Sequence, residues 1–175
     1  MATVDQEEAR LVARANAGEP GALEALYRAH RGWALALATR LTGSPDDGLD
    51  VLQETFAWFF GRFPGFELTS TVRAFLYPVV RHQSLSLLRR RRRVVELSSV
   101  REPEALPDTA FPGELARMTR PLPDGQREVL LLRFGLDMTL AEIGDALSVP
   151  VGTVKSRLHH ALAALREAEA ADEAG

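Results

Sequence analysis

Apolar residues recur along much of this chain at intervals of three and four positions, the spacing of one face of an α-helix. Up to residue 93 the pattern predicts four helices, near residues 5–17, from Leu23 to Leu41, from Pro45 to about Arg62, and from about Thr71 to Arg92. No stretch of useful length alternates apolar and polar residues as a β-strand does, and there is no internal repeat. The pattern therefore predicts an all-α protein.

The third predicted helix has the clearest start. Ser44 is a good N-cap, Pro45 suits the first helical position, and Asp46 and Asp47 place negative charge where the helix dipole favours it. One side of this helix is apolar and is expected to be buried; it consists of Leu49, Leu52, Phe56, Phe59, Phe60 and Phe63. The opposite side is polar and consists of Asp50, Gln53, Glu54 and Ala57. Taken alone, such a polar side is usually just exposed to solvent.

Two short helices separated by a tight turn are predicted after residue 139. Only Ser148, Val149 and Pro150 lie between their apolar faces, which consist of Leu140, Ile143 and Leu147 and then of Val154, Leu158, Leu162 and Leu165. The remaining surface of the second helix carries hydrogen-bond donors and no acid; these residues are Thr153, Lys155, Ser156, Arg157, His159 and His160. This is the layout of a helix-turn-helix, whose second helix lies in the major groove of DNA. The alternative is an ordinary helical hairpin.

Residues 94–117 differ in composition from the segments on either side. Three prolines and a glycine interrupt any helical pattern there, and five acids make the stretch acidic. We interpret it as an extended acidic linker between two small helical domains, residues 1–93 and 118–168, with an acidic tail at residues 169–175. A disordered tether with no further role is an equally good interpretation.

The overall charge adds a complication, because a formal net charge of −3 over 175 residues is unexpected for a protein that binds nucleic acid. The distribution resolves it: no acid stands between Leu68 and Val95, and arginines run without interruption from Arg89 to Arg93. An apolar fraction of 46% is enough for small cores. Neither a membrane-spanning stretch nor a signal-peptide pattern is present, so we expect a soluble, cytoplasmic protein without membrane insertion.

The sequence offers no motif for catalysis or for a cofactor. It has no cysteine, which rules out disulfides and thiol-based metal sites. The adjacent His159 and His160 diverge by about 100° on a helix, and no carboxylate stands near them at ligand spacing. There is also no phosphate-binding loop, nucleophile motif or plausible acid–base pair. We predict no enzyme, no metal site and no cofactor.

The motifs around the helix-turn-helix resemble a known family. They are Leu122–Phe134, Glu142-Ile143, Val151–His159 and Ala163–Arg166. Over roughly residues 118–168, without a gap, they resemble region 4 of bacterial sigma factors of the extracytoplasmic-function (ECF) group. This resemblance implies that the second helix binds the upstream promoter element through the six donor residues named above. The family usually has arginine where His160 stands. Because histidine gains charge only near pH 6.5, we expect DNA binding here to be weak at neutral pH.

The first domain resembles region 2 of the same group, in the same order and spacing. The motifs are Ala22–Arg28, Leu52–Phe56, Val72–Tyr77 and Leu87–Arg90. By this resemblance, Asp50, Gln53 and Glu54 dock on the coiled-coil clamp helices of the polymerase β′ subunit. The resemblance also implies a set of DNA-binding residues: Arg73, Arg81, His82, Arg89, Arg90, Arg91, Arg92 and Arg93. Several positions depart from the family pattern, which leaves the promoter preference open; these are Phe75, Pro78, His82 and Ser86.

Aromatic residues of the first domain have two possible roles. Phe63, Phe66, Phe75 and Tyr77 are able to stack on unpaired bases, or they belong to the core, which we favour for Phe63 and Phe75. The loop Phe66–Thr71 is the better candidate for holding an extruded base. The arginine run is expected to neutralise phosphates without reading sequence.

Across both regions the resemblance covers nearly the whole chain. It implies an ECF sigma factor that binds core RNA polymerase, through the β and β′ subunits, and directs it to promoter DNA, with an anti-sigma factor as a further partner. One alternative is a stand-alone helix-turn-helix regulator without polymerase docking. Another is a module that binds no DNA and sequesters a different protein. The polar side of the third helix separates the first two, because only a sigma factor needs it.

Overall fold

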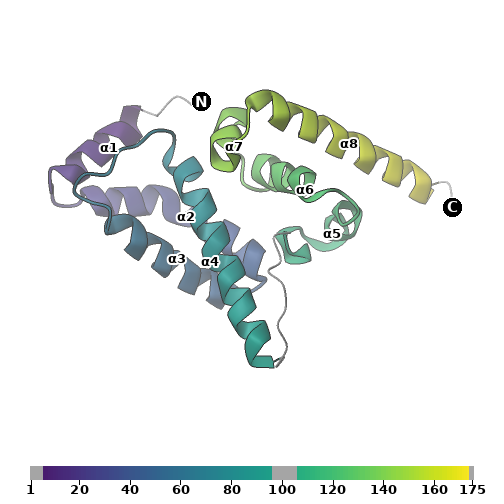
Figure 1. Cartoon of the computed structure of the whole chain (residues 1–175), viewed down its shortest axis with the longest axis horizontal. Helices are drawn as coiled ribbons and strands as arrows, with labels where there is room; N and C mark the ends of the chain where they lie inside the picture. The colour runs from purple at the N-terminus through teal and green to yellow at the C-terminus, as the bar shows by residue number, and fades with distance from the viewer. Residues whose placement is uncertain (1–5, 96–105, 174–175) are drawn as a thin grey trace.

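The computed structural model describes residues 6–95 and 106–173 of the chain, and the statements below concern these residues. They form helices and no strand, which confirms the all-α prediction. The first group contains α1 (Gln6–Asn16), α2 (Ala22–Thr42), α3 (Pro45–Phe60) and α4 (Val72–Val95). The second contains η1 (Asp108–Ala110), α5 (Gly113–Thr119), α6 (Asp124–Leu130), the π-turn η2 (Leu131–Gly135), α7 (Leu140–Leu147) and α8 (Val151–Glu173). Figure 1 shows the two groups side by side.

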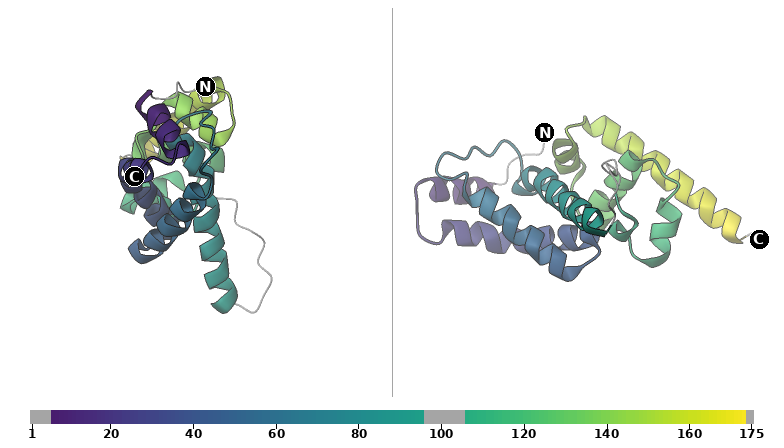
Figure 2. Two further views of the ribbon diagram at one scale, coloured as in Figure 1. Left: turned by 90° about the vertical axis from the view of Figure 1, so that its left-hand side faces the viewer. Right: turned by 60° about the horizontal axis from the view of Figure 1, so that its bottom comes forward.

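The start of α3 follows the predicted chemistry, and α7 starts with a cap that was not predicted from the sequence. At α3, the side chain of Ser44 accepts a hydrogen bond from the backbone N–H of Asp47 at 3.3 Å, with Pro45 in the first turn. At α7, Thr139 and Glu142 form a reciprocal capping box. Pro78 lies inside α4, and the helix continues through it to Val95. The last turns of α4 project from the body of the molecule (Figures 1 and 2).

The two groups share one hydrophobic core rather than forming separate ones. Its most buried members come from both groups, and include Leu26, Leu37, Phe59, Leu76, Leu131, Met138 and Ile143. The predicted burial is wrong for one residue of the apolar side of α3: Leu49 is 45% exposed. The reason is its place around the helix: Asp47 and Gly48 face α4 and α2, whereas Leu49 lies on the exposed side with Asp50.

Hydrogen bonds join the two groups along α4 and α7. Ser70 donates to Asp145 at 2.5 Å, and Thr71 donates to Glu142 at 3.2 Å. Glu128 of α6 accepts from the Tyr77 hydroxyl and pairs with Arg81 at 2.9 Å. Burial raises the pKa of Tyr77 above its usual range, and the adjacent Glu128 carboxylate raises it further. Carboxylates of the second group therefore meet donors of the first.

The predicted extended linker does not hold for residues 106–117. Leu106, Ala110 and Phe111 are buried, and α5 begins at Gly113. The buried Arg127 side chain holds this segment by donating to the Leu106 carbonyl at 3.0 Å and to the Asp108 carboxylate at 3.2 Å. The apolar side chains gain burial, since η1 packs on α2 as well as on α5, and this offsets the poor helix-forming composition. Residues 94–95 belong to α4, and residues 96–105 of the predicted linker lie outside the described residues.

Candidate nucleic-acid and protein interfaces

The turn between α7 and α8 is built from backbone contacts. Ser148 ends α7 in the left-handed conformation, with φ of 54°, and the N–H of Val149 donates to the Gly144 carbonyl at 2.9 Å. A side chain on Gly144 would place its Cβ 2.9 Å from the Val149 carbonyl oxygen, so only glycine fits there. Helix α8 then begins at Val151 and buries Val154 and Leu158. This is the predicted helix-turn-helix arrangement.

The outer surface of α8 presents a set of donors. Lys155, Ser156, His159 and His160 are exposed, while Thr153 and Arg157 are half-buried. The Arg157 guanidinium lies against Gly125, since a Cβ there would be 3.0 Å from its Cζ atom. Arg157 thus packs on α6, and the four exposed side chains are the ones available to a partner. No acid stands between Val151 and Arg166, so this surface suits an anionic ligand.

The polar side of α3 is exposed over its whole length. Asp50, Gln53, Glu54 and Ala57 are all exposed, and the apolar Leu49 lies at the same end of the helix. This part of α3 therefore carries two acids, an amide and one apolar side chain that solvent can reach. We call the surface formed by Leu49, Asp50, Gln53 and Glu54 the α3 face.

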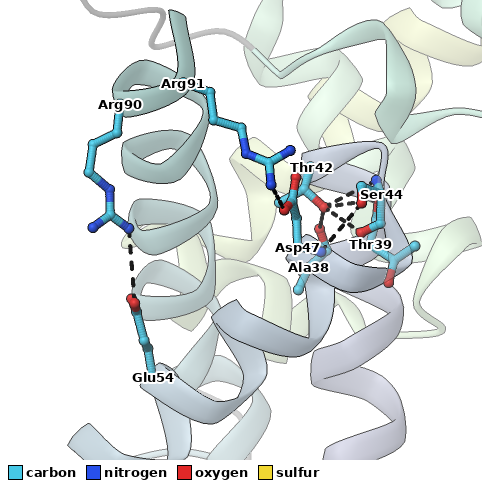
Figure 3. Close-up of polar contacts among 8 residues, drawn as sticks. All are labelled: Ala38, Thr39, Thr42, Ser44, Asp47, Glu54, Arg90 and Arg91. Atoms are coloured by element: carbon cyan, nitrogen blue, oxygen red, sulfur yellow. Dashed lines mark hydrogen bonds and ion pairs between the residues drawn. The ribbon is translucent and has the colours of Figure 1, made fainter. Parts of the chain in front are cut away.

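Two of the arginines near the end of α4 contact α3, as Figure 3 shows. Arg91 forms an ion pair with Asp47, whose side chain is only 2% exposed. Arg90 approaches Glu54, with Nη2 3.9 Å from Oε1, and both of these side chains are more than half exposed. The interpretation of the run as phosphate-binding only is therefore incomplete, because part of it binds acids of α3. The side chains of Arg92 and Arg93 lie outside the described residues.

The remaining predicted DNA-binding residues of the first group have different environments. His82 is exposed, whereas Arg73, Arg81 and Arg89 are half-buried. Arg81 is the residue that pairs with Glu128 of α6. The exposed described members of this predicted set are thus His82, Arg90 and Arg91, of which Arg91 is paired with Asp47.

The aromatic residues are mainly core residues. Tyr77 and Phe66 are buried, and Phe63 and Phe75 are half-buried against the same cluster, with Phe66 and Phe75 ring centroids 4.7 Å apart. This favours the core role for Phe63 and Phe75, and it also removes Phe66 and Tyr77 as exposed stacking surfaces.

Sequence reasoning missed Trp58. Its ring stacks on Phe75 at 5.7 Å, and the Arg62 guanidinium lies 4.2 Å from its centroid. Trp58, Phe75 and Ser70 line one side of a cavity of about 650 Å³, and residues of the turn between α7 and α8 line the other. The sequence pattern gave little indication of this role, because Trp58 lies beside the predicted apolar side of the third helix and is not one of its residues.

A buried histidine lies deep in the first group. Burial lowers the pKa of His30 to about 4, and the nearby positive charge of Arg73 acts in the same direction. Glu8 lies 3.3 Å from its Nε2, but burial outweighs this attraction. Over the described parts of the chain, no group of three or more His, Cys, Asp and Glu residues is placed to hold a metal ion. None of the helices within residues 6–95 and 106–173 is long and apolar enough to cross a membrane.

Comparison with known proteins gives the family. Residues 26–94 match Sigma-70 region 2, and residues 120–167 match Sigma-70, region 4. The RNA polymerase sigma-E factor of Streptomyces coelicolor is 33% identical over 155 residues, covering 86% of this chain and 87% of that protein. The ECF RNA polymerase sigma factor SigL of Mycobacterium tuberculosis is 31% identical over 166 residues, covering 89% and 93%.

Solved structures share the fold of this chain. CnrH in complex with the cytosolic domain of CnrY has a TM-score of 0.67 and 28% identity, over 94% of this chain and 98% of that chain. The sigma factor RpoE in complex with the anti-sigma factor NepR, from Bartonella quintana, shares the fold with a TM-score of 0.60 at 22% identity, over 84% and 96%. With both regions matched in order around the α3 face and the helix-turn-helix, the chain belongs to the ECF RNA polymerase sigma factors of the sigma-70 family.

Proposed function

We propose that this protein binds core RNA polymerase, directs it to particular promoters and helps to open the DNA there. The observation that carries the proposal is the presence, in one chain, of an exposed surface with acids and an amide on α3 and an exposed, acid-free surface on α8. Catalysis belongs to the polymerase, and the protein itself is not an enzyme. It acts in the cytoplasm, where polymerase and DNA are found.

The α3 face is the proposed docking surface for the coiled-coil clamp helices of β′. Asp50, Gln53 and Glu54 project from it into solvent, and nothing in the described first group covers them except the approach of Arg90 to Glu54. Exposed apolar side chains of the second group, Phe134 at 64% and Leu115 at 39%, supply a separate surface for the β subunit.

DNA recognition is divided between the two regions in this proposal. The domain of residues 118–168 binds the upstream element, with α8 in the major groove and Lys155, Ser156, His159 and His160 nearest the bases. The domain of residues 1–93 binds the downstream element through α4 and the preceding loop. An anti-sigma factor is proposed as a further partner, supported by the similar structures of sigma factors solved in such complexes.

A direct test uses run-off transcription with core polymerase on a pool of genomic promoters. The double variant Gln53→Ala with Glu54→Ala should weaken core binding by roughly 2–4 kcal/mol, as polar hot-spot contacts do, with helical content and melting temperature unchanged. Glu24→Ala, an exposed glutamate on α2, is the matched control and should keep wild-type affinity.

The competing function, a stand-alone regulator, makes the opposite prediction. It requires promoter binding without core polymerase and no effect of the α3 double variant. Unchanged core affinity in that variant would therefore remove the main support for the proposed docking.

A further inference from the structure

Helix α1 holds the loop that joins α3 to α4. We call residues 61–71 the α3–α4 loop. Asn16, the last residue of α1, accepts hydrogen bonds through Oδ1 from the backbone N–H groups of Gly65 (2.8 Å) and Phe66 (3.0 Å). Its Nδ2 donates to the Phe66 carbonyl at 2.8 Å. One amide side chain thus satisfies three backbone groups that are about fifty positions away in the sequence.

The other end of the loop is held by a second residue of α1. Glu8 accepts a hydrogen bond from the backbone N–H of Val72, the first residue of α4, at 3.0 Å. Its second carboxylate oxygen faces the buried His30. Glu8 and Asn16 stand about two helical turns apart. Helix α1 therefore fixes both the entrance of the loop, at Gly65 and Phe66, and its exit, at Val72.

The segment between these two anchors is the part that faces outward. Thr69 is exposed, and Ser70, with Trp58 and Phe75, lines the cavity of about 650 Å³. The hydroxyls of Ser70 and Thr71 donate to carboxylate oxygens of α7 in this arrangement, and Thr71 is buried. The half-buried Ser70 is therefore the donor that the edge of an unpaired base can reach once α7 moves away.

Discrimination between bases depends on how firmly such a loop is held. A donor that moves by an ångström serves several bases equally well, whereas a fixed donor rejects those without a matching acceptor. The loop contains no helix or strand of its own, so the backbone N–H groups of Gly65 and Phe66 have no partner from regular secondary structure. Asn16 supplies that partner.

We propose that Asn16 and Glu8 are positioning residues that hold the α3–α4 loop in the conformation that reads an unpaired base of the downstream promoter element. The inference rests on the proposed function, since it assigns DNA reading to this loop. Neither residue touches the DNA in this proposal. Because Val12 and Ala15 anchor α1 through buried side chains, removing the Asn16 amide leaves the helix in place.

The test measures base preference with the full chain in holoenzyme. Single-stranded oligonucleotides are selected from a randomised pool on the wild-type holoenzyme, and each base of the selected site is then replaced in turn. Asn16→Ala should reduce the affinity ratio between the best and worst base about tenfold, because the loop loses three anchoring hydrogen bonds. Affinity for core polymerase and for upstream duplex DNA should stay within about twofold.

Two further variants keep the test decisive if Asn16→Ala folds poorly. Asn16→Asp keeps the acceptor for Gly65 and Phe66 and should retain more base preference than alanine. Glu8→Gln keeps an acceptor for Val72, whereas Glu8→Ala does not, so glutamine should preserve the preference better. Arg10→Ala, exposed on the same helix, is the matched control and should behave as wild type.

The outcomes distinguish failure of the proposed function from failure of the positioning role of Asn16 and Glu8. A wild-type holoenzyme without any base preference would overturn the proposed function, and the positioning role with it. A wild-type preference that survives in both Asn16→Ala and Glu8→Ala would overturn the positioning role alone. So would an equal loss of base preference, core affinity and upstream binding, since that pattern indicates general damage to the fold.

Discussion

The ion pair between Asp47 and Arg91 shows that neighbouring arginines at the end of α4 have different roles. The Asp47 carboxylate is almost completely buried at the start of α3, where the helix dipole favours its charge, and Arg91 reaches it from α4. Arg90, one position earlier, lies over the exposed Glu54 instead. Neighbouring arginines thus serve different ends: one joins two helices, and the other shares a surface with the proposed docking residues.

We expect Arg91→Gln to destabilise the fold by about 1–2 kcal/mol, because it leaves a buried carboxylate without its charged partner. Arg90→Gln should change stability by less than about 0.5 kcal/mol, since its pair is exposed. Urea unfolding measures both. In DNA titrations over a range of salt, Arg90→Gln should lower the salt slope more than Arg91→Gln. Equal stability of the two variants would contradict this division.

His30 makes stability depend on pH. Its folded-state pKa of about 4 lies below the unfolded value near 6.5, so the unfolded chain takes up a proton first as pH falls. The unfolding free energy should therefore decrease from about pH 6.5 to about pH 4, by up to about 3 kcal/mol, and be constant above that window with respect to this group. Urea unfolding between pH 7.5 and 4.5 tests it. In His30→Gln this part of the dependence should disappear; the same slope in both proteins would exclude His30 as its source.

Among the elements, those with a long, regular apolar period were predictable, and those held by distant partners were not. Helices α2, α3 and α8 follow their spacing closely. Helix α5 and the buried segment at Leu106 and Phe111 were missed because prolines mask a short apolar pattern, and the stabilising Arg127 is remote in sequence. The same applies to the candidate site: the exposed residues of α3 and α8 follow from helical periodicity. The roles of Trp58 and Asn16 depend on contacts across the fold that no local pattern reveals.

Helix α8 offers a test at its exposed surface. We expect His160→Arg to strengthen upstream-element binding at pH 7.5 by about 1–2 kcal/mol, because arginine is charged at every pH and forms bidentate contacts with guanine or phosphate. Fluorescence anisotropy with promoter duplex at pH 7.5 measures the difference in affinity. Equal affinity of the variant and the wild type would rule out His160 as a DNA contact.

In the molecule as a whole, acidic side chains of the second half hold the two halves together. Glu128, Glu142 and Asp145 bind Arg81, Tyr77, Thr71 and Ser70 of the first half, so they occupy donors on the surface that we propose for downstream DNA. DNA phosphates and these carboxylates thus compete for the same groups. Binding of the downstream element is expected to require that the halves move apart.

Glu128→Gln tests this competition by removing one charge at constant shape. The closed arrangement should lose about 1–2 kcal/mol, since a charge-assisted contact with Arg81 and Tyr77 is weakened. We expect a larger radius of gyration in solution scattering and about threefold or more tighter binding of promoter DNA. Glu114→Gln, whose exposed partner Arg117 lies within α5, is the control. A variant that remains as compact as wild type and binds DNA equally would show that the contact does not limit binding.

The anchoring of Leu106 and Asp108 by Arg127 has a consequence for how far the halves can separate. Helix α4 ends at Val95, and Leu106 is already held by Arg127, so eleven peptide units of chain join these two points. Eleven peptide units span at most about 40 Å when fully extended. Once one half is bound to its promoter element, the other is confined within that radius and is present at an effective local concentration far above that of the protein in solution. Two individually weak DNA contacts then act as one strong contact, but only on promoters whose two elements both lie within that reach.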